Sequence, residues 1–284
     1  MKLAAIGSNC IDFYVNQQGG TAYPGGGPVN MAVYTCRLGG QASYTGPIGD
    51  DANGRLMLDA MKAKGIDTSH VRIFPGRTAV TQVRLENGER IFGKYDQGVL
   101  AGFRLTESDL DFIAGHDMAV SDPWSGAQDR FADLKRRGVK LAFDASDCPD
   151  HPICTPGISG CDYLFFSSDD SDGSLLRARM KALRERGPEL VTAMLGSKGS
   201  LCFDGAQFYS FGIIPCPNLV DTLGAGDSYI AGFLYALAEG RPIPECMRLG
   251  AETASETIGY FGAWNCQKED ISSGKQIHRS FRAG

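Results

Sequence analysis

The sequence lacks the features of membrane, nucleic-acid-binding and disulfide-stabilised proteins. No apolar run approaches the roughly 18 residues that a membrane span needs, and the N-terminal apolar run breaks after Ile6, so no signal peptide is predicted. The formal net charge of -5 argues against a nucleic-acid partner. Nine cysteines include no Cys-x-x-Cys pair, and only four histidines accompany them, so no zinc spacing emerges. We expect a soluble, cytoplasmic protein with free thiols and no membrane partner.

The 284 residues could form one large α/β domain over 1–284 or two small ones, and the sequence has no internal repeats, low-complexity tracts or convincing linker. From Thr106 onward, apolar segments of strand length alternate with helical patterns, which argues for a mainly parallel sheet in an α/β fold. Besides 3–6 near the N-terminus, the predicted strands are 118–121, 140–143, 163–166 and 190–195, and 200–203 with 208–211 form a predicted hairpin. The last predicted helix runs over about 244–260.

The most informative stretch is Val-Asp-Thr-Leu-Gly-Ala-Gly-Asp at 220–227, directly before an amphipathic helix. Gly224, Ala225 and Gly226 are small, so their backbone N–H groups can surround a ligand. At a helix N-terminus such groups and the helix dipole favour an anion. Asp227 in the same turn would repel a resting anion, but it makes sense as a base that takes a proton from a nucleophile attacking a held phosphate. The stretch therefore predicts phosphoryl transfer.

Two further segments suggest how a substrate is held. Asp12 follows the first predicted strand, at the end where open α/β sheets bind ligands. A helix predicted to begin at Pro28 places Asn30 about one turn inside, within reach of a ligand at its mouth. The segment from Thr78 to Tyr95 alternates in polarity around Asn-Gly, which predicts a β-hairpin that projects from the main sheet.

The Asp-Thr-x-Gly-Ala-Gly-Asp string resembles the C-terminal signature of the ribokinase-like (PfkB-type) carbohydrate kinases, and Gly25-Gly26-x-x-x-Asn30 resembles their sugar-binding signature. The resemblance implies a single doubly wound α/β domain with a small β lid, here roughly 12–23 and 77–96. It implies Asp227 as catalytic base, amides of 224–226 that stabilise the transferred phosphoryl group, and sugar contacts from Asp12, Gly26 and Asn30.

The same resemblance implies ATP as co-substrate with Mg²⁺, and a nucleotide loop that includes Gly196, Ser197 and Gly199. It suggests a monovalent cation such as K⁺ at the carbonyls of Asp221 and Leu223. The family's Asn-x-x-Glu motif, tied to Mg²⁺ handling, is replaced here by Ser167-x-x-Asp170, and Met194 stands where a threonine is frequent. A non-catalytic sensor on the same fold is therefore an alternative.

A finer resemblance is to the bacterial fructoselysine 6-kinases, through stretches such as Gly7–Asp12, Arg90–Tyr95 and Tyr260–Trp264. It implies phosphorylation at O6 of fructoselysine or a related fructosamine, with another sugar or a nucleoside as the nearer alternative. Strand alternation puts Arg90, Phe92 and Lys94 on one face, and Arg90 is the predicted partner of the substrate carboxylate. The lid is also a predicted homodimer contact.

Overall fold

The computed structural model describes residues 1–16, 20–86 and 89–264, apart from the side chains of Leu85, Glu89 and Arg90. Its large sheet has nine strands in the order β13-β12-β11-β10-β9-β8-β1-β4-β5. These strands are β1 (Lys2–Ile6), β4 (Gln41–Gly49), β5 (Asp67–Phe74), β8 (Met118–Ser121), β9 (Lys140–Asp144), β10 (Tyr163–Ser167), β11 (Leu190–Met194), β12 (Ser200–Phe203) and β13 (Phe208–Phe211). Neighbours pair in parallel from β5 to β11, and β12 and β13 pair antiparallel.

Helices cover both faces of this sheet because its buried strands present apolar side chains in both directions. On β1, Leu3 and Ala5 belong to one core, and Ala4 and Ile6 belong to the other. The first core is completed by α1 (Gly27–Arg37), α2 (Ala52–Ala63), α7 (Ala225–Ala238) and α8 (Ile243–Thr257), and the second by α3 (Glu107–Ile113), α4 (Phe131–Arg136), α5 (Thr155–Gly160) and α6 (Ser174–Arg184). The predicted doubly wound α/β fold is therefore confirmed.

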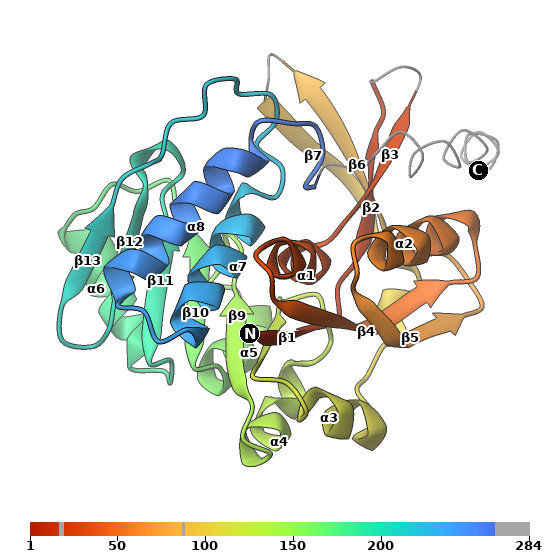
Figure 1. The fold of residues 1–284 in the computed structure, drawn as a ribbon, viewed down its shortest axis with the longest axis horizontal. Coiled ribbons are helices and arrows are strands. Elements are labelled where there is room, and N and C mark those ends of the chain that lie inside the picture. The colour runs from red at the N-terminus through yellow and green to blue at the C-terminus, as the bar shows by residue number, and fades with distance from the viewer. Residues whose placement is uncertain (17–19, 87–88, 265–284) are drawn as a thin grey trace.

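A second sheet projects from the large one, at the top of Figure 1. Its order is β3-β2-β6-β7, formed by β2 (Cys10–Tyr14), β3 (Thr21–Gly25), β6 (Val80–Glu86) and β7 (Glu89–Asp96). The predicted hairpin is confirmed as the antiparallel pair β6–β7, in which Glu86 faces Glu89. The Asn87-Gly88 turn itself lies outside the described residues. We call this four-stranded sheet the lid sheet.

A bulge in the lid sheet corrects one detail of the prediction. Thr81 pairs with Tyr95 but Val83 pairs with Phe92, so three steps along β7 match two along β6. The extra residue in β7 interrupts the alternation of side chains between the faces. The expectation that residues 90, 92 and 94 share one face therefore fails at the bulge.

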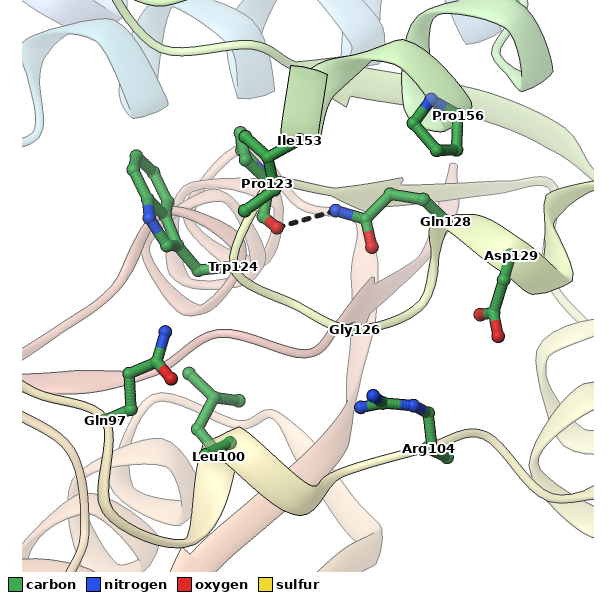
Figure 2. Close-up of a pocket in the computed structure, with 11 residues that line it drawn as sticks. Gln97, Leu100, Arg104, Pro123, Trp124, Gly126, Gln128, Asp129, Ile153 and Pro156 are labelled. Carbon is green, nitrogen blue, oxygen red and sulfur yellow. Dashed lines mark hydrogen bonds between the residues drawn. The ribbon is translucent and has the colours of Figure 1, made fainter. Parts of the chain in front are cut away.

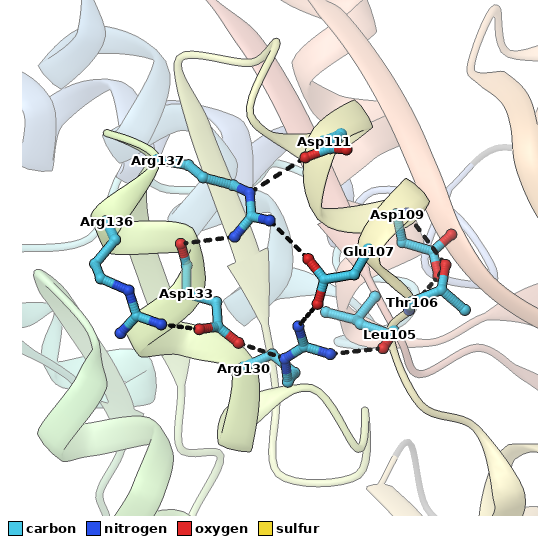
Figure 3. Close-up of polar contacts among 9 residues, drawn as sticks. All are labelled: Leu105, Thr106, Glu107, Asp109, Asp111, Arg130, Asp133, Arg136 and Arg137. Carbon is cyan, nitrogen blue, oxygen red and sulfur yellow. Dashed lines mark hydrogen bonds and ion pairs between the residues drawn. The ribbon is translucent and has the colours of Figure 1, made fainter.

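The remaining elements follow their local signals closely. The last helix spans Ile243–Thr257 rather than 244–260. Thr106 and Asp109 form a capping box at the start of α3, as their spacing indicates. Ion pairs of Arg130 and Arg137 with Glu107 then join α3 to the segment around α4 (Figure 3). Among the described residues, no helix has the length and apolar character that would let it cross a membrane.

Candidate active site

The candidate site lies where the winding of the large sheet reverses. β1 has β4 on one side and β8 on the other, and the chain passes from β1 through β4 and β5 before it returns to β8. Such a switch point leaves a crevice at the carboxyl ends of the strands, where ligands of open α/β sheets bind. Gly7 follows β1 and Asp122 follows β8. A Cβ atom on Gly7 would come within 2.1 Å of the Ser125 side chain, so the loops meet closely there.

The predicted anion-binding turn opens α7. Gly224 is the N-cap residue and has a left-handed backbone, with φ of 76°. A Cβ atom at this position would lie 2.8 Å from the Cβ of Ala263, so glycine suits both the conformation and the space. Ala225 and Gly226 form the first turn, and Gly226 lies against Met194. The Ala225 N–H donates to the Thr222 carbonyl over 3.3 Å. The turn lies at the positive end of a helix of 14 residues, where an anion is favoured.

Asp227 belongs to that first turn and is held by Asn30 of α1. The Asn30 Nδ2 donates to Asp227 Oδ2 over 2.7 Å. The Asn30 Oδ1 in turn accepts a hydrogen bond of 2.6 Å from Nε1 of the fully buried Trp264, which fixes the orientation of the amide. Desolvation raises the pKa of Asp227, and the Asn30 hydrogen bond opposes part of that rise. A raised pKa makes the carboxylate a stronger base for a hydroxyl proton.

Two more carboxyl groups lie near Asp227, and sequence reasoning missed both. Asp122 follows β8 and is buried, and desolvation raises its pKa to about 7 despite a hydrogen bond from Ser8. Asp144 ends β9, and desolvation together with the charge of Asp227 raises its pKa to about 8. A Cβ on Gly27 would lie 3.2 Å from Asp227 Oδ1 and 3.7 Å from Asp122 Oδ2. Both acids directly follow the predicted strands 118–121 and 140–143, and this position is the sequence signal that points to them.

The predicted sugar-binding residues flank this carboxylate. Asp12 is buried on β2 rather than in a loop, and its Oδ2 would lie 2.3 Å from a Cβ atom on Gly25. Gly26 precedes α1 with φ of 103°, and a Cβ there would meet the Asn9 backbone at 2.6 Å. The structure therefore brings Asn30 directly to Asp227, whereas Asp12 lies beside the glycines that precede α1.

Arg90 lies on β7 opposite Leu85, but its side chain is outside the described part of the structure. On the same hairpin, the Arg84 side chain is exposed and pairs with Glu86.

The predicted nucleotide loop follows β11. Gly196 opens the short turn η4 (Gly196–Lys198), which contains Ser197, and Gly199 follows it. Both glycines have positive φ, 57° and 89°. A Cβ on Gly199 would lie 2.1 Å from the carbonyl oxygen of Phe211, so the loop depends on glycine there. Lys198 Nζ donates to the Asp169 carbonyl over 2.6 Å, which ties this loop to the one after β10.

The residues predicted to bind cations, Asp170 for Mg²⁺ and Asp221 with Leu223 for K⁺, differ in their burial and hydrogen bonds. The exposed Asp170 accepts a hydrogen bond of 3.0 Å from the Ser168 hydroxyl. Asp221 is buried, and its carboxylate accepts hydrogen bonds from the Tyr14 hydroxyl and from the backbone N–H groups of Leu223 and Gly262. Within residues 1–16, 20–86 and 89–264, no group of three or more acidic, His or Cys side chains is arranged to hold a metal.

A doubly wound sheet with an anion-binding helix start beside a buried base is the apparatus of a phosphoryl-transfer enzyme. Comparison with known proteins names the class. The chain belongs to the pfkB family of carbohydrate kinases, whose sequence model matches residues 1–118 and 153–270. It is thus a carbohydrate kinase, as the Asp-Thr-x-Gly-Ala-Gly-Asp string predicts.

Individual relatives cover almost the whole chain. Fructoselysine 6-kinase of Shigella flexneri is 41% identical over 262 residues, which are 92% of this chain and 99% of that protein. Fructosamine kinase FrlD of Bacillus subtilis is 34% identical and covers 93% of both chains. Among solved structures, the ribokinase of Arabidopsis thaliana, complexed with ribose and ATP, superposes with a TM-score of 0.83 at 23% identity and covers 96% of this chain and 98% of its own. This last likeness confirms the fold.

Proposed function

We propose that the protein transfers the γ-phosphoryl group of ATP to O6 of fructoselysine or of a related fructosamine. The observation that carries the proposal is the hydrogen bond between Asn30 and Asp227 at the N-terminus of α7, because an oriented carboxylate beside a helix start supports the role of a base next to a bound phosphate. The names of the relatives, fructoselysine 6-kinase and fructosamine kinase, support the substrate. The match to the pfkB family supports the reaction.

In the proposed reaction, Asp227 accepts the proton of the sugar hydroxyl as that oxygen attacks the γ-phosphorus. The helix start at Gly224, Ala225 and Gly226 stabilises the charge on the transferred group, because the N–H groups and the dipole at a helix N-terminus favour an anion. Asn30 and Asp12 orient the sugar, with Gly26 leaving room for it. The lid sheet closes over the sugar and excludes water that would otherwise hydrolyse ATP.

Mg²⁺ bound with the donor would neutralise charge on its phosphates. Mg²⁺ is commonly held by one or two carboxylates together with substrate phosphates, and the exposed carboxylate of Asp170 fits that role. Gly196, Ser197 and Gly199 would contact the nucleotide. K⁺ bound by the carbonyls of Asp221 and Leu223 would add positive charge behind the anion-binding turn. The free cysteines accord with a reducing, cytoplasmic setting.

A substrate panel tests the proposal. ATP consumption and product mass are measured with fructoselysine, another fructosamine, fructose, ribose and a nucleoside. We expect phosphorylated fructoselysine as the product of the highest kcat/KM. Preference for another sugar or a nucleoside would overturn the proposed substrate, while the family assignment would still hold. Binding of these ligands without ATP turnover would favour the non-catalytic sensor. The replacement of the family's motif residues by Ser167 and Met194 supports that alternative.

A further inference from the structure

A cavity of about 350 Å³ opens beside the candidate active site, between three segments that each follow a strand end (Figure 2). One segment includes η1 (Gly98–Gly102) after the lid strand β7, one is the loop 123–129 after β8, and one starts at η3 (Pro152–Cys154) after β9. Gln97 lines this cavity and also a neighbouring hollow of about 560 Å³ at the end of β7. The cavity therefore lies on the side of the sheet where the substrate binds, next to the base of the lid sheet.

The wall of this cavity is bonded directly to the carboxylate cluster of the active site. The backbone N–H of Trp124 donates to Asp122 Oδ1 over 3.1 Å. The Gln128 side chain donates to the carbonyls of Asp122 and Pro123, over 2.9 and 2.7 Å. The other carboxylate oxygen of Asp122 and the carboxylate of Asp227 both lie close to Gly27. The Asp122–Trp124 turn thus links the wall of the cavity to the carboxyl groups near Asp227.

Two opposite charges line the cavity. The Arg104 guanidinium lies beside Gly126, where a Cβ atom would come within 3.2 Å of Arg104 Nη1, and Asp129 lies on the same side in Figure 2. Within the described part of the chain, no ion pair joins either side chain to another group. Arg104 Nη1 donates a hydrogen bond of 2.5 Å to the carbonyl of Phe103, which leaves its charge without an acidic partner among the described residues. The next residue, Arg130, contrasts with them, because it is held by Glu107 and Asp133 (Figure 3).

The rest of the lining is suited to a hydrocarbon chain. Trp124 and Ile153 are large apolar side chains, 38% and 39% exposed, and both face this cavity. Leu100 lies opposite them, on the η1 side. Exposed aromatic and aliphatic groups around a hollow with two charges form the usual composition of a small-molecule site.

We infer that this cavity is the subsite for the amino-acid end of the substrate. In it, Arg104 binds the α-carboxylate, Asp129 binds the α-ammonium group, and Trp124 and Ile153 pack against the aliphatic chain. A planar guanidinium can hold a carboxylate through two parallel hydrogen bonds. The inference rests on the proposed function, since only a substrate with an amino-acid substituent uses both charges.

Part of the cavity lining lies outside the shared family pattern. The family model matches residues 1–118 and 153–270, so Trp124, Gln128 and Asp129 lie outside both ranges, whereas Arg104 and Ile153 lie inside them. The unmatched part of the lining is where we expect this chain to differ from carbohydrate kinases that act on sugars without such a substituent.

Steady-state kinetics of the full chain tests the subsite. Fructoselysine, its Nα-acetyl derivative and fructose are compared for the wild type and for Arg104→Gln, Asp129→Asn, Arg90→Gln and Arg248→Gln. Arg248 on α8 pairs with Glu252 and serves as the matched surface control. We expect Arg104→Gln to lower kcat/KM for fructoselysine about tenfold or more, mainly through KM, and so to reduce its preference over fructose. Asp129→Asn should remove the wild type's preference for the free α-ammonium over the acetylated form.

The outcomes separate the subsite from the function. If Arg104→Gln and Asp129→Asn behave like Arg248→Gln while the wild type phosphorylates fructoselysine, the subsite is refuted and the function stands. If only Arg90→Gln loses the preference for fructoselysine over fructose, the carboxylate partner lies on the lid sheet and the proposed subsite is also refuted. A wild type that does not phosphorylate fructoselysine would overturn the proposed function instead. Thermal melting of each variant, with an unchanged Tm expected, separates a kinetic loss from misfolding.

Discussion

The two ends of the proposed substrate path are built differently. At the reacting end, Asp227 is fixed by Asn30, and Asn30 is fixed by the buried Trp264. At the other end, Arg104 and Asp129 line an open cavity, and no ion pair within the described residues restrains either of them. Asn30, Asp227 and Arg104 lie inside the ranges that the pfkB family model matches, whereas Asp129 lies outside them. The difference indicates that the proposed chemistry depends on side chains fixed by hydrogen bonds, and the proposed selectivity on exposed side chains around an open cavity.

The largest effect is expected at the rigid end. Asp227→Asn keeps the shape of the side chain and can keep a hydrogen bond to Asn30, but it cannot accept the hydroxyl proton. We expect turnover to fall by about 10²–10⁴, with sugar binding and Tm nearly unchanged. Initial rates and calorimetric sugar binding check this, with the exposed Asp59→Asn on α2 as a matched surface control. Near-normal turnover in Asp227→Asn would remove this residue from the role of base.

The buried Asp122 lies between the two regions, since it accepts a hydrogen bond from the backbone of Trp124 and lies near Asp227. Desolvation raises the pKa of Asp122 to about 7, so its neutral form is favoured in the folded state, while the unfolded chain titrates near the usual value of about 4. The folded state then binds more protons between these values, and stability is lost as pH rises through this window. The Asp122→Asn variant lacks this titrating group, so its stability lacks this part of the pH dependence.

Urea unfolding of the wild type and of Asp122→Asn at pH 5 and pH 8 measures this loss. Relative to the variant, the wild type should lose about 1–3 kcal/mol of unfolding free energy between the two pH values. If the free energies of unfolding of the two proteins differ by the same amount at both pH values, Asp122 is ionised throughout and its pKa is not raised.

The smallest expected effect lies on the lid sheet. β7 is an edge strand, and Ile91, Phe92 and Tyr95 are exposed on it by 47%, 61% and 37%. An exposed apolar edge favours pairing with a second copy. We therefore expect a dimer whose dissociation constant rises by about tenfold or more, or about 1.4 kcal/mol, in Phe92→Asp. Sedimentation over a concentration series checks it, with the exposed Leu175→Asp on α6 as control. A wild type that remains monomeric at micromolar concentration would rule this contact out.

Much of this arrangement was predictable from local signals. The small residues at 224–226 with an acid after them, the helix pattern that follows, and the Pro28 start of α1 all act over a few residues. Strands such as β8, β9 and β10 are short apolar runs that are buried on both faces, so their composition identifies them. The hairpin β6–β7 follows from alternation around an Asn-Gly pair.

What could not be predicted depends on pairing between distant segments. β4 contains Gly46 and Pro47, and β5 is largely polar, so neither has a clear strand pattern. Single acids such as Asp122 and Asp144 carry no motif, and only the strand order brings them to Asp227. The Trp264–Asn30 hydrogen bond joins residues 234 positions apart. The cavity at Arg104 likewise needs three separate loops to meet.

The most direct test of the central claim compares two substrates on the same enzyme. The ratio of kcat/KM for fructoselysine to that for fructose reports whether a carbohydrate kinase site is coupled to recognition of the amino-acid substituent. We predict a ratio of at least about ten, or about 1.4 kcal/mol of differential transition-state stabilisation, with phosphate found on O6. Equal or better activity on fructose would contradict the account of substrate recognition and leave the kinase chemistry at Asp227 standing.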